Sequence, residues 1–162
     1  AARALQDHRE FNAHLLPDRL EQKEAINLGV AIALPDGLVA PAVLNCEEKS
    51  LAQIARATKD LVARAKSGGL RPEELTEGTF STSNLGMFDV DEFSAIIVPP
   101  QVAILAVGAV KPTPVVRDGQ VVVAEMMKAT LSADHRAVDG VQAARLLQDI
   151  RKHLENPVSL LV

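Results

Sequence analysis

Apolar and polar positions recur along the chain with two different periods, and these periods predict its helices and strands. Helical spacing predicts a long helix over residues 50–67 and another over residues 141–154, with shorter helical segments at residues 1–8 and 72–75. The long helix begins with a capping box, Ser50 with Gln53, and ends at Gly68-Gly69. The predicted buried faces are Leu51, Ile54, Ala55, Leu61, Val62 and Ala65 in the first helix and Val141, Ala144, Leu147, Ile150 and Leu154 in the last.

Short aliphatic runs bounded by turn residues predict the strands. They cover residues 26–34, 38–44, 93–98, 102–110 and 121–131. A run of hydroxyl residues at 78–86 also has a strand pattern, and from the sequence alone it can be merely polar sheet surface. A turn is expected at residues 35–37, and a hairpin turn at residues 117–120. The prolines of residues 111–114 predict a break between strands, and residues 11–17 are predicted to form a loop. The fully apolar strand at residues 102–110 is typical of a sheet centre or a subunit interface. This order of strands and helices predicts an α+β fold.

Composition narrows the class of protein. The 162 residues suit one domain, and 48% hydrophobic residues are enough to form a core. With 17 basic and 21 acidic residues, no basic patch and only four aromatic residues, the chain is not expected to bind nucleic acid. Its longest apolar run is far shorter than the ~20 residues that cross a bilayer.

Cys46 is the only cysteine, which excludes an intrachain disulfide and is typical of a reducing compartment. Its acidic neighbours, Glu47 and Glu48, would raise a thiol pKa, so we expect a small packing residue at a strand end and not a nucleophile. We likewise expect His14 to be structural or solvated and Lys128 to face solvent.

The strongest candidate for chemistry lies at residues 132–140, between the last strand and the last helix. His135 could exchange a proton near neutral pH, and Asp139 could be fixed with it by one local turn. The same residues also fit a purely structural reading, in which Asp139 caps the helix with Gln142 and His135 is a hydrogen-bonded loop residue. No second histidine or cysteine lies nearby at the spacing of metal ligands, so no metal is predicted.

The residue identities of this segment are more specific than its spacing. Asp134-His135-Arg136, followed two residues later by Asp139-Gly140, resembles the active-site motif of the dihydrolipoyl acyltransferases, the core components of 2-oxo acid dehydrogenase complexes. Residues 80–86 resemble the family's second motif, Phe-x-x-Ser-Asn-Leu-Gly, and residues 11–13, 30–33 and 36–41 are also similar. The resemblance covers nearly the whole chain.

This resemblance implies a chloramphenicol-acetyltransferase-like fold, in which helices flank a mixed β-sheet. It also implies a homotrimer that assembles into an octahedral or icosahedral core, with active sites between subunits. Residues 1–162 would form a catalytic domain that is incomplete at its N-terminus, because the family's first helix and strands should precede Ala1. The lipoyl and peripheral-subunit-binding domains, absent from this chain, would recruit the 2-oxo acid dehydrogenase and dihydrolipoamide dehydrogenase subunits.

Two further expectations follow from the resemblance. The apolar tail at residues 158–162, expected to have no helix of its own, would dock into a neighbouring trimer. The compartment would be a bacterial cytoplasm or the mitochondrial matrix.

The reaction implied by the resemblance moves an acetyl group between dihydrolipoamide and coenzyme A, without a metal. His135 would be the general base, and Ser83 from the adjacent subunit would stabilise the oxyanion. Asp139 would hold the loop and orient the histidine, and Arg136 would make a structural ion pair. Asp134 belongs to the motif without a separate role.

Three alternatives stay open. An antibiotic acetyltransferase of the same fold usually has His-His, whereas here Asp134 precedes His135. A branched-chain or succinyl transferase is a second alternative; residues 83–88 and 132–136 look most like acetyl-transferring members, although residues 89–91 lack a glycine often found there. A non-catalytic core scaffold is the third, but the presence of both Ser83 and His135 favours an enzyme.

Overall fold

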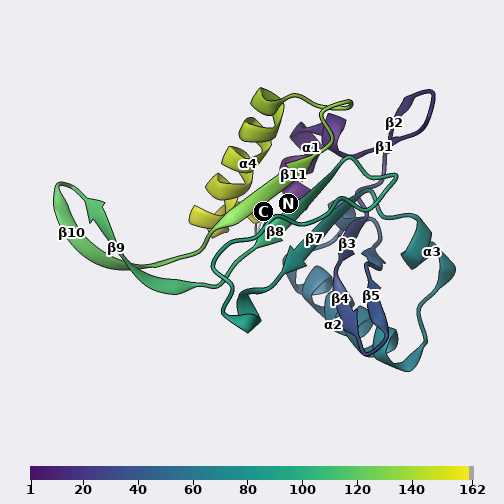
Figure 1. Cartoon of the computed structure of the whole chain (residues 1–162), viewed down its shortest axis with the longest axis horizontal. Coiled ribbons are helices and arrows are strands. Elements are labelled where there is room, and N and C mark those ends of the chain that lie inside the picture. The colour runs from purple at the N-terminus through teal and green to yellow at the C-terminus, as the bar shows by residue number, and fades with distance from the viewer. Residues whose placement is uncertain (161–162) are drawn as a thin grey trace.

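The computed structural model describes residues 1–160 and has a five-stranded mixed sheet at its centre, in the order β11-β8-β7-β3-β6 (Figure 1). The inner strands β3 (Leu28–Val30), β7 (Phe80–Asn84) and β8 (Ala103–Val107) run parallel. The edge strands β6 (Ala42–Val43) and β11 (Ala129–Ala133) are antiparallel to their neighbours. The predicted α+β class is therefore confirmed, and the apolar strand at residues 102–110 does lie inside the sheet.

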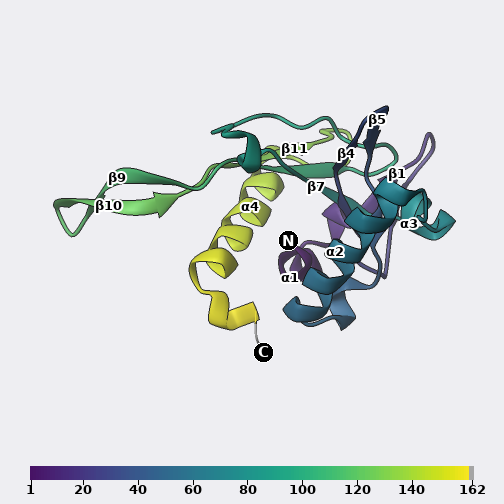
Figure 2. The same ribbon diagram turned by 90° about the horizontal axis from the view of Figure 1, so that it is seen from below.

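Helices cover one side of this sheet. Figure 2 shows α1 (Ala2–Asp7), α2 (Leu51–Ser67) and α4 (Gly140–Glu155) on the same side, with α3 (Pro72–Thr76) following α2. The capping boxes predicted at Ser50 and Asp139 are both present, and Gly68 ends α2 with a φ of +75° that favours glycine. Between the helices and the sheet lies the core, whose largest buried members include Phe11, Phe80, Leu5, Ile26, Leu61 and Leu146.

The buried faces of the two long helices differ from the prediction. In α2 the face runs through Ile54, Ala57, Leu61 and Ala65, whereas Leu51 and Ala55 are exposed. In α4 it runs through Ala143, Leu146, Leu147 and Ile150, whereas Val141, Ala144 and Leu154 are exposed. Both faces keep the spacing of a helix, but the alanines in each sequence leave more than one apolar face possible.

Two long predicted strands are each divided between different sheets. Residues 26–34 form β3 in the main sheet and β4 (Ile32–Leu34), which pairs with β5 (Gly37–Val39) around the predicted turn. Residues 121–131 belong to β10 (Gln120–Met126) and to β11. The hydrophobic pattern predicts that a segment is buried but not which strand it pairs with. It therefore could not show that one segment is shared between two sheets.

Several other segments depart from expectation. Residues 111–114, predicted as a break, are part of β9 (Lys111–Arg117). In a two-stranded ribbon each strand has an unpaired edge, and a proline there removes no hydrogen bond between the strands. The strand predicted at residues 93–98 does not form, since no partner strand for it lies within residues 1–160. The loop predicted at residues 11–17 contains β1 (Ala13–Leu15), paired with β2 (Leu20–Gln22) after the short 3₁₀ helix η1 (Arg9–Phe11).

Three more 3₁₀ turns complete the chain: η2 (Cys46–Glu48), η3 (Gly86–Phe88) and η4 (Pro157–Leu160). The last corrects the expectation of a tail without a helix. Leu161 and Val162, which belong to the predicted docking tail, lie outside the described residues. None of the helices within residues 1–160 is long and apolar enough to cross a membrane.

The antiparallel pair β9 and β10 forms an arm, residues 111–126, that extends away from the rest of the molecule (Figures 1 and 2). It presents apolar side chains to solvent, with Val116 at 71% exposure and Val121 and Val123 at 74%. An isolated two-stranded ribbon is only marginally stable in water. The apolar side chains of the arm would be buried if it packed against another surface.

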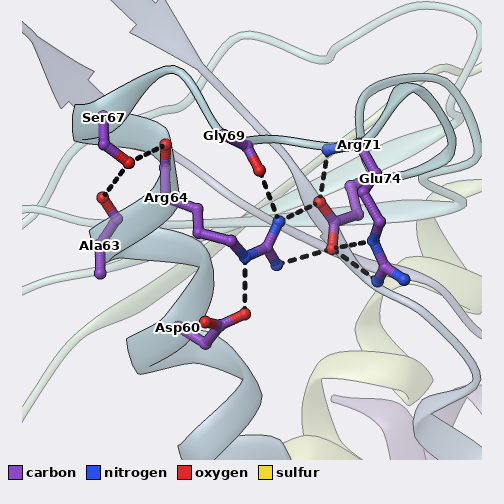
Figure 3. A network of polar contacts seen from close by, with 7 residues as sticks. All are labelled: Asp60, Ala63, Arg64, Ser67, Gly69, Arg71 and Glu74. Atoms are coloured by element: carbon purple, nitrogen blue, oxygen red, sulfur yellow. Dashed lines mark hydrogen bonds and ion pairs between the residues drawn. The ribbon is translucent and has the colours of Figure 1, made fainter.

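A buried carboxylate ties α3 to the C-terminal end of α2 (Figure 3). Glu74, only 2% exposed, accepts hydrogen bonds from the guanidinium of Arg64 at 2.6 and 2.7 Å and also from Arg71. The Arg64 guanidinium, together with Arg71, lowers the pKa of Glu74 to about 2. Arg64 in turn donates to Asp60, one helical turn earlier in α2. This network fixes the crossing from α2 to β7.

Candidate active site

His135 lies in a tight turn that follows β11. The N–H of Asp134 donates to the carbonyl of Val102 at 2.8 Å, and the N–H groups of Ala137 and Val138 donate back to the carbonyl of Asp134. Val138 is buried and anchors the far side of the turn. The backbone around His135 is therefore held on both sides, while its imidazole is exposed.

The residues that flank the histidine form the predicted structural ion pair. Arg136 donates from its guanidinium to both carboxylate oxygens of Asp134, at 2.7 to 3.3 Å, and from its backbone N–H at 3.0 Å. These bonds lower the pKa of Asp134 to about 2, so the carboxylate stays ionised throughout the neutral range. Asp134, which had no separate role from sequence, thus closes the turn that presents His135.

Asp139 is the N-cap of α4. Its carboxylate accepts from the N–H of Gln142 at 2.8 Å, and the side chain of Gln142 accepts from the N–H of Asp139 at 2.8 Å. Within the described part of the chain no hydrogen bond joins Asp139 to His135. The structure therefore shows the helix cap formed by Asp139, whereas its role in orienting the histidine stays a prediction.

Ser83 lies near the C-terminal end of β7, half-buried. The chain then turns sharply, because the side chain of Asn84 accepts from the N–H of Gly86 at 2.8 Å. A Cβ atom at Gly86 would lie 2.8 Å from the carbonyl oxygen of Gly108, so only glycine fits at this close approach. The Ser-Asn-Leu-Gly motif is thus a strand end and a tight turn that fix the position of Ser83.

One chain does not bring Ser83 and His135 together. Ser83 pairs with Ala106 of β8, while Ala133, two residues before His135, pairs with Ala103. Three residues along β8 and two strand spacings across it place the Cα atoms of Ser83 and Ala133 about 14 Å apart. His135 lies farther along the chain, beyond the end of the strand. A site that uses both side chains must draw them from two copies of the chain.

The remaining candidates have contacts that explain them without catalysis. Burial raises the pKa of the Cys46 thiol, which donates to the carbonyl of Val43. His14 is buried in β1 with its Nε2 2.8 Å from the carbonyl of Gly78, and exposed Lys128 pairs with Glu92 at 2.9 Å. Among residues 1–160 no three His, Cys, Asp or Glu side chains gather as metal ligands do.

One cavity of the described chain, about 340 Å³, lies at the base of the arm. Its lining includes Lys111, Met126, Met127 and Lys128, but neither Ser83 nor His135. A smaller cavity of about 130 Å³ lies beside the Glu74 network. Neither of these two cavities is lined by Ser83 or His135.

Comparisons with known proteins identify the class that this fold and these motifs define. The family model described as "2-oxoacid dehydrogenases acyltransferase (catalytic domain)" matches residues 1–162. Of the solved structures, the pyruvate dehydrogenase cubic core has a TM-score of 0.93 at 32% identity, over 99% of this chain and 67% of that one. Chloramphenicol acetyltransferase, with a TM-score of 0.55 at 14% identity over 93% of this chain and 72% of that one, shares the fold alone. The chain belongs to the 2-oxo acid dehydrogenase acyltransferase family.

Particular relatives are named as acetyltransferases. The dihydrolipoyllysine-residue acetyltransferase component of the pyruvate dehydrogenase complex of Rhizobium meliloti is 42% identical over 99% of this chain and 36% of its own length. Its mitochondrial counterpart from Schizosaccharomyces pombe is 45% identical over 98% of this chain and 34% of its own. The chain spans about a third of the length of these curated relatives.

A solved relative has been studied for its mechanism. The dihydrolipoamide acetyltransferase of Azotobacter vinelandii has a TM-score of 0.93 and 33% identity, over 99% of this chain and 67% of that one. That work concerns the roles of a serine, a histidine and an asparagine in its catalytic mechanism. The spacing between those three residues equals the spacing between Ser83, His135 and Asp139.

Proposed function

We propose that this protein transfers an acetyl group between dihydrolipoamide and coenzyme A, in the core of a pyruvate dehydrogenase complex. The observation that carries the proposal is the shared spacing of Ser83, His135 and Asp139 with the three residues studied in the A. vinelandii enzyme. The fixed turn at His135 and the fixed strand end at Ser83 supply two rigid supports for these side chains.

His135 acts as the general base in this proposal. A neutral thiol is a poor nucleophile, so the imidazole removes its proton as the sulfur attacks the carbonyl carbon of the thioester. The tetrahedral intermediate collapses with cleavage of the original C–S bond, and the imidazolium returns the proton to the departing thiolate. One acetyl group and one proton have then exchanged between two sulfur atoms, and no covalent acyl-enzyme is formed.

Ser83 donates a hydrogen bond to the negative oxygen of the tetrahedral intermediate. Preorganised donors of this kind are worth about 10² to 10³ in rate, and a general base about 10² to 10⁴. The sheet geometry supports supply of Ser83 and His135 by different subunits, since one chain holds them at opposite ends of β8. Asp139 contributes by holding the turn and α4 together.

We further propose that three chains form a trimer and that trimers build the larger cage. The exposed valines of the arm support a contact with another subunit, because their burial would remove a large apolar surface from water. Lipoyl groups would arrive on separate domains, and the 2-oxo acid dehydrogenase and dihydrolipoamide dehydrogenase subunits would bind the same complex. The compartment would be a bacterial cytoplasm or the mitochondrial matrix.

The test is acetyl transfer from acetyl-CoA to dihydrolipoamide by the full-length protein, with isobutyryl-CoA and succinyl-CoA for comparison. Acetyl-CoA should be the best donor. His135→Ala should lower kcat by about 10² to 10⁴, and Ser83→Ala by about 10² to 10³ with little change in KM. Near-normal turnover of His135→Ala would exclude it as the base, and a preference for another donor would reassign the complex.

A further inference from the structure

Ser81 and Gln101 form a hydrogen bond in the interior that the proposed mechanism does not use. The Ser81 hydroxyl donates to the side-chain oxygen of Gln101 at 2.7 Å. Ser81 is fully buried and Gln101 is 7% exposed, so water has little access to either partner. Removal of one partner would leave the other unpaired in the interior, which makes this bond costly to break.

Two glycines make the space in which this bond lies. A Cβ atom at Gly29 would be 2.5 Å from Oγ of Ser81, and one at Gly78 would be 2.9 Å from Nε2 of Gln101. Both distances are shorter than van der Waals contact, so a larger residue at either position would displace one of the partners. Gly29 lies within β3, although a glycine weakens a strand. The surroundings therefore hold the two side chains in one arrangement.

The bond lies next to the part of β7 that presents Ser83. At Ser81 and Thr82, β7 is paired on both sides, with β3 and with β8. Ser83 pairs with β8 alone, because the pairing with β3 ends at Thr82. Side chains two residues apart on a strand lie on the same face, about 7 Å from one another. The bond of Ser81 with Gln101 is thus a fixed point on the face of Ser83, just before the strand loses one neighbour.

Gln101 belongs to a segment that is held in place by other parts of the chain. Its backbone pairs with His14 of β1. The carbonyl of the next residue, Val102, accepts a hydrogen bond of 2.8 Å at the start of the turn that presents His135. Because both of these contacts use the backbone, a substitution of the Gln101 side chain should leave them in place. The side chain of Gln101 is therefore the part of this segment that acts on Ser83.

Resting on the proposed function, we propose that Gln101 is a positioning residue for acetyl transfer. Its side chain fixes Ser81 and, through the backbone that joins Ser81 to Ser83, the direction in which the Ser83 hydroxyl points. A hydrogen-bond donor stabilises an oxyanion when it is preorganised, and small displacements from that geometry lower the rate. In this role Gln101 touches neither substrate nor the reacting atoms. Its loss should therefore lower kcat and leave substrate binding unchanged.

The test uses two single variants and their combination, in the full-length protein. Gln101→Met nearly keeps the length of the side chain but removes the strong acceptor, and Ser81→Ala removes the donor. The double variant contains neither polar group, so it should recover stability that each single variant loses. Thr79→Val is the matched control, because it removes another buried hydroxyl bond, to Asn12 at 2.6 Å, just before β7.

Gln101→Met and the double variant should each lower kcat about tenfold, with the KM values for acetyl-CoA and dihydrolipoamide within about twofold of wild type. Thr79→Val should lose stability in chemical denaturation but keep the wild-type kcat. In a chain that already carries Ser83→Ala, Gln101→Met should lower kcat no further, because it acts through the missing hydroxyl. Recovery of kcat together with stability in the double variant overturns the proposal, as does a further loss in the Ser83→Ala chain.

Other outcomes separate this inference from the proposed function. If the wild type moves no acetyl group, the proposed function itself has failed. If Ser83→Ala loses turnover while Gln101→Met behaves as wild type, only the inference about Gln101 has failed. If Gln101→Met alone does not assemble in sedimentation, the kcat of the double variant decides. If neither assembles, the bond serves the fold and the proposal is overturned.

Discussion

At the scale of single residues, the buried carboxylate of Glu74 makes the clearest prediction for stability. Glu74→Gln removes the charge that compensates Arg64 and Arg71 but keeps nearly the same volume. Because Arg64 retains some exposure to water, we expect a loss of about 2–4 kcal/mol in the free energy of unfolding. Chemical denaturation measures it, with the exposed neighbour Glu73→Gln as the control that should change little.

The same residue predicts a dependence on pH. The pKa of Glu74 falls from its ordinary value of 4.5 to about 2 in the folded chain. Its ionised form therefore stabilises the fold fully above about pH 4.5, and this contribution is lost as the pH falls toward 2. The stability difference between wild type and Glu74→Gln should be constant near neutrality and shrink over that range. A difference that stays constant down to pH 2 would contradict the assignment.

Substitutions at Asp139 distinguish its role as a helix cap from any role of its negative charge. Asparagine caps helices as well as aspartate does, whereas alanine does not, so Asp139→Ala should cost about 1 kcal/mol and Asp139→Asn very little. The A. vinelandii work concerns an asparagine at the corresponding spacing. Acetyl transfer by Asp139→Asn should accordingly stay within a few-fold of wild type. If Asp139→Asn were as inactive as His135→Ala, the carboxylate would have a role beyond the cap.

Sequence predicted individual residues well wherever a local pattern decides their contacts. The capping boxes at Ser50 and Asp139 and the ion pair of Arg136 depend on neighbours within three residues, and the structure contains all three. The bonds of Glu74 with Arg64 depend on the way α3 folds back onto α2, across ten residues of chain. No local sequence pattern predicts such a contact, so it was not predicted.

At the scale of elements, the arm of β9 and β10 is the segment whose role is most open to test. We expect Val121→Asp combined with Val123→Asp to leave the folded chain intact, since both side chains are already exposed. The two charges should break the proposed trimer if the arm makes an apolar contact within it. Sedimentation should show smaller species, and acetyl transfer should be lost with them.

The control is Leu38→Asp, which changes an exposed leucine on the β4–β5 hairpin. It should assemble and react as wild type does. Full-size assemblies in the doubly substituted arm variant would show that the arm makes no essential contact between subunits.

Helices were predictable from the sequence, whereas strands were predictable neither always in existence nor always in extent. The helices depend on periodicity and caps within one segment, and each predicted helix is present. Strand limits depend on distant partners, which explains why residues 121–131 were predicted as one strand although they serve both the arm and the main sheet. Residues 93–98 have the composition of a strand, but no described strand pairs with them.

At the scale of the whole molecule, the main feature is that one chain keeps the two candidate site residues, Ser83 and His135, apart. Family motifs made Ser83 and His135 the candidates, but only the strand register shows that they lie at opposite ends of β8. Sequence alone carries no information on this separation, because the register depends on pairing between distant segments. In the proposed trimer, each site would combine Ser83 of one subunit with His135 of the next.

Complementation between two inactive variants tests this directly. Ser83→Ala and His135→Ala subunits are mixed in equal amounts, dissociated and reassembled, and acetyl transfer is compared with that of each variant alone. If sites form between subunits, random mixing should restore about a quarter of wild-type activity, since half the sites receive an intact serine and half of those an intact histidine. Activity no higher than that of the separate variants would contradict the shared site.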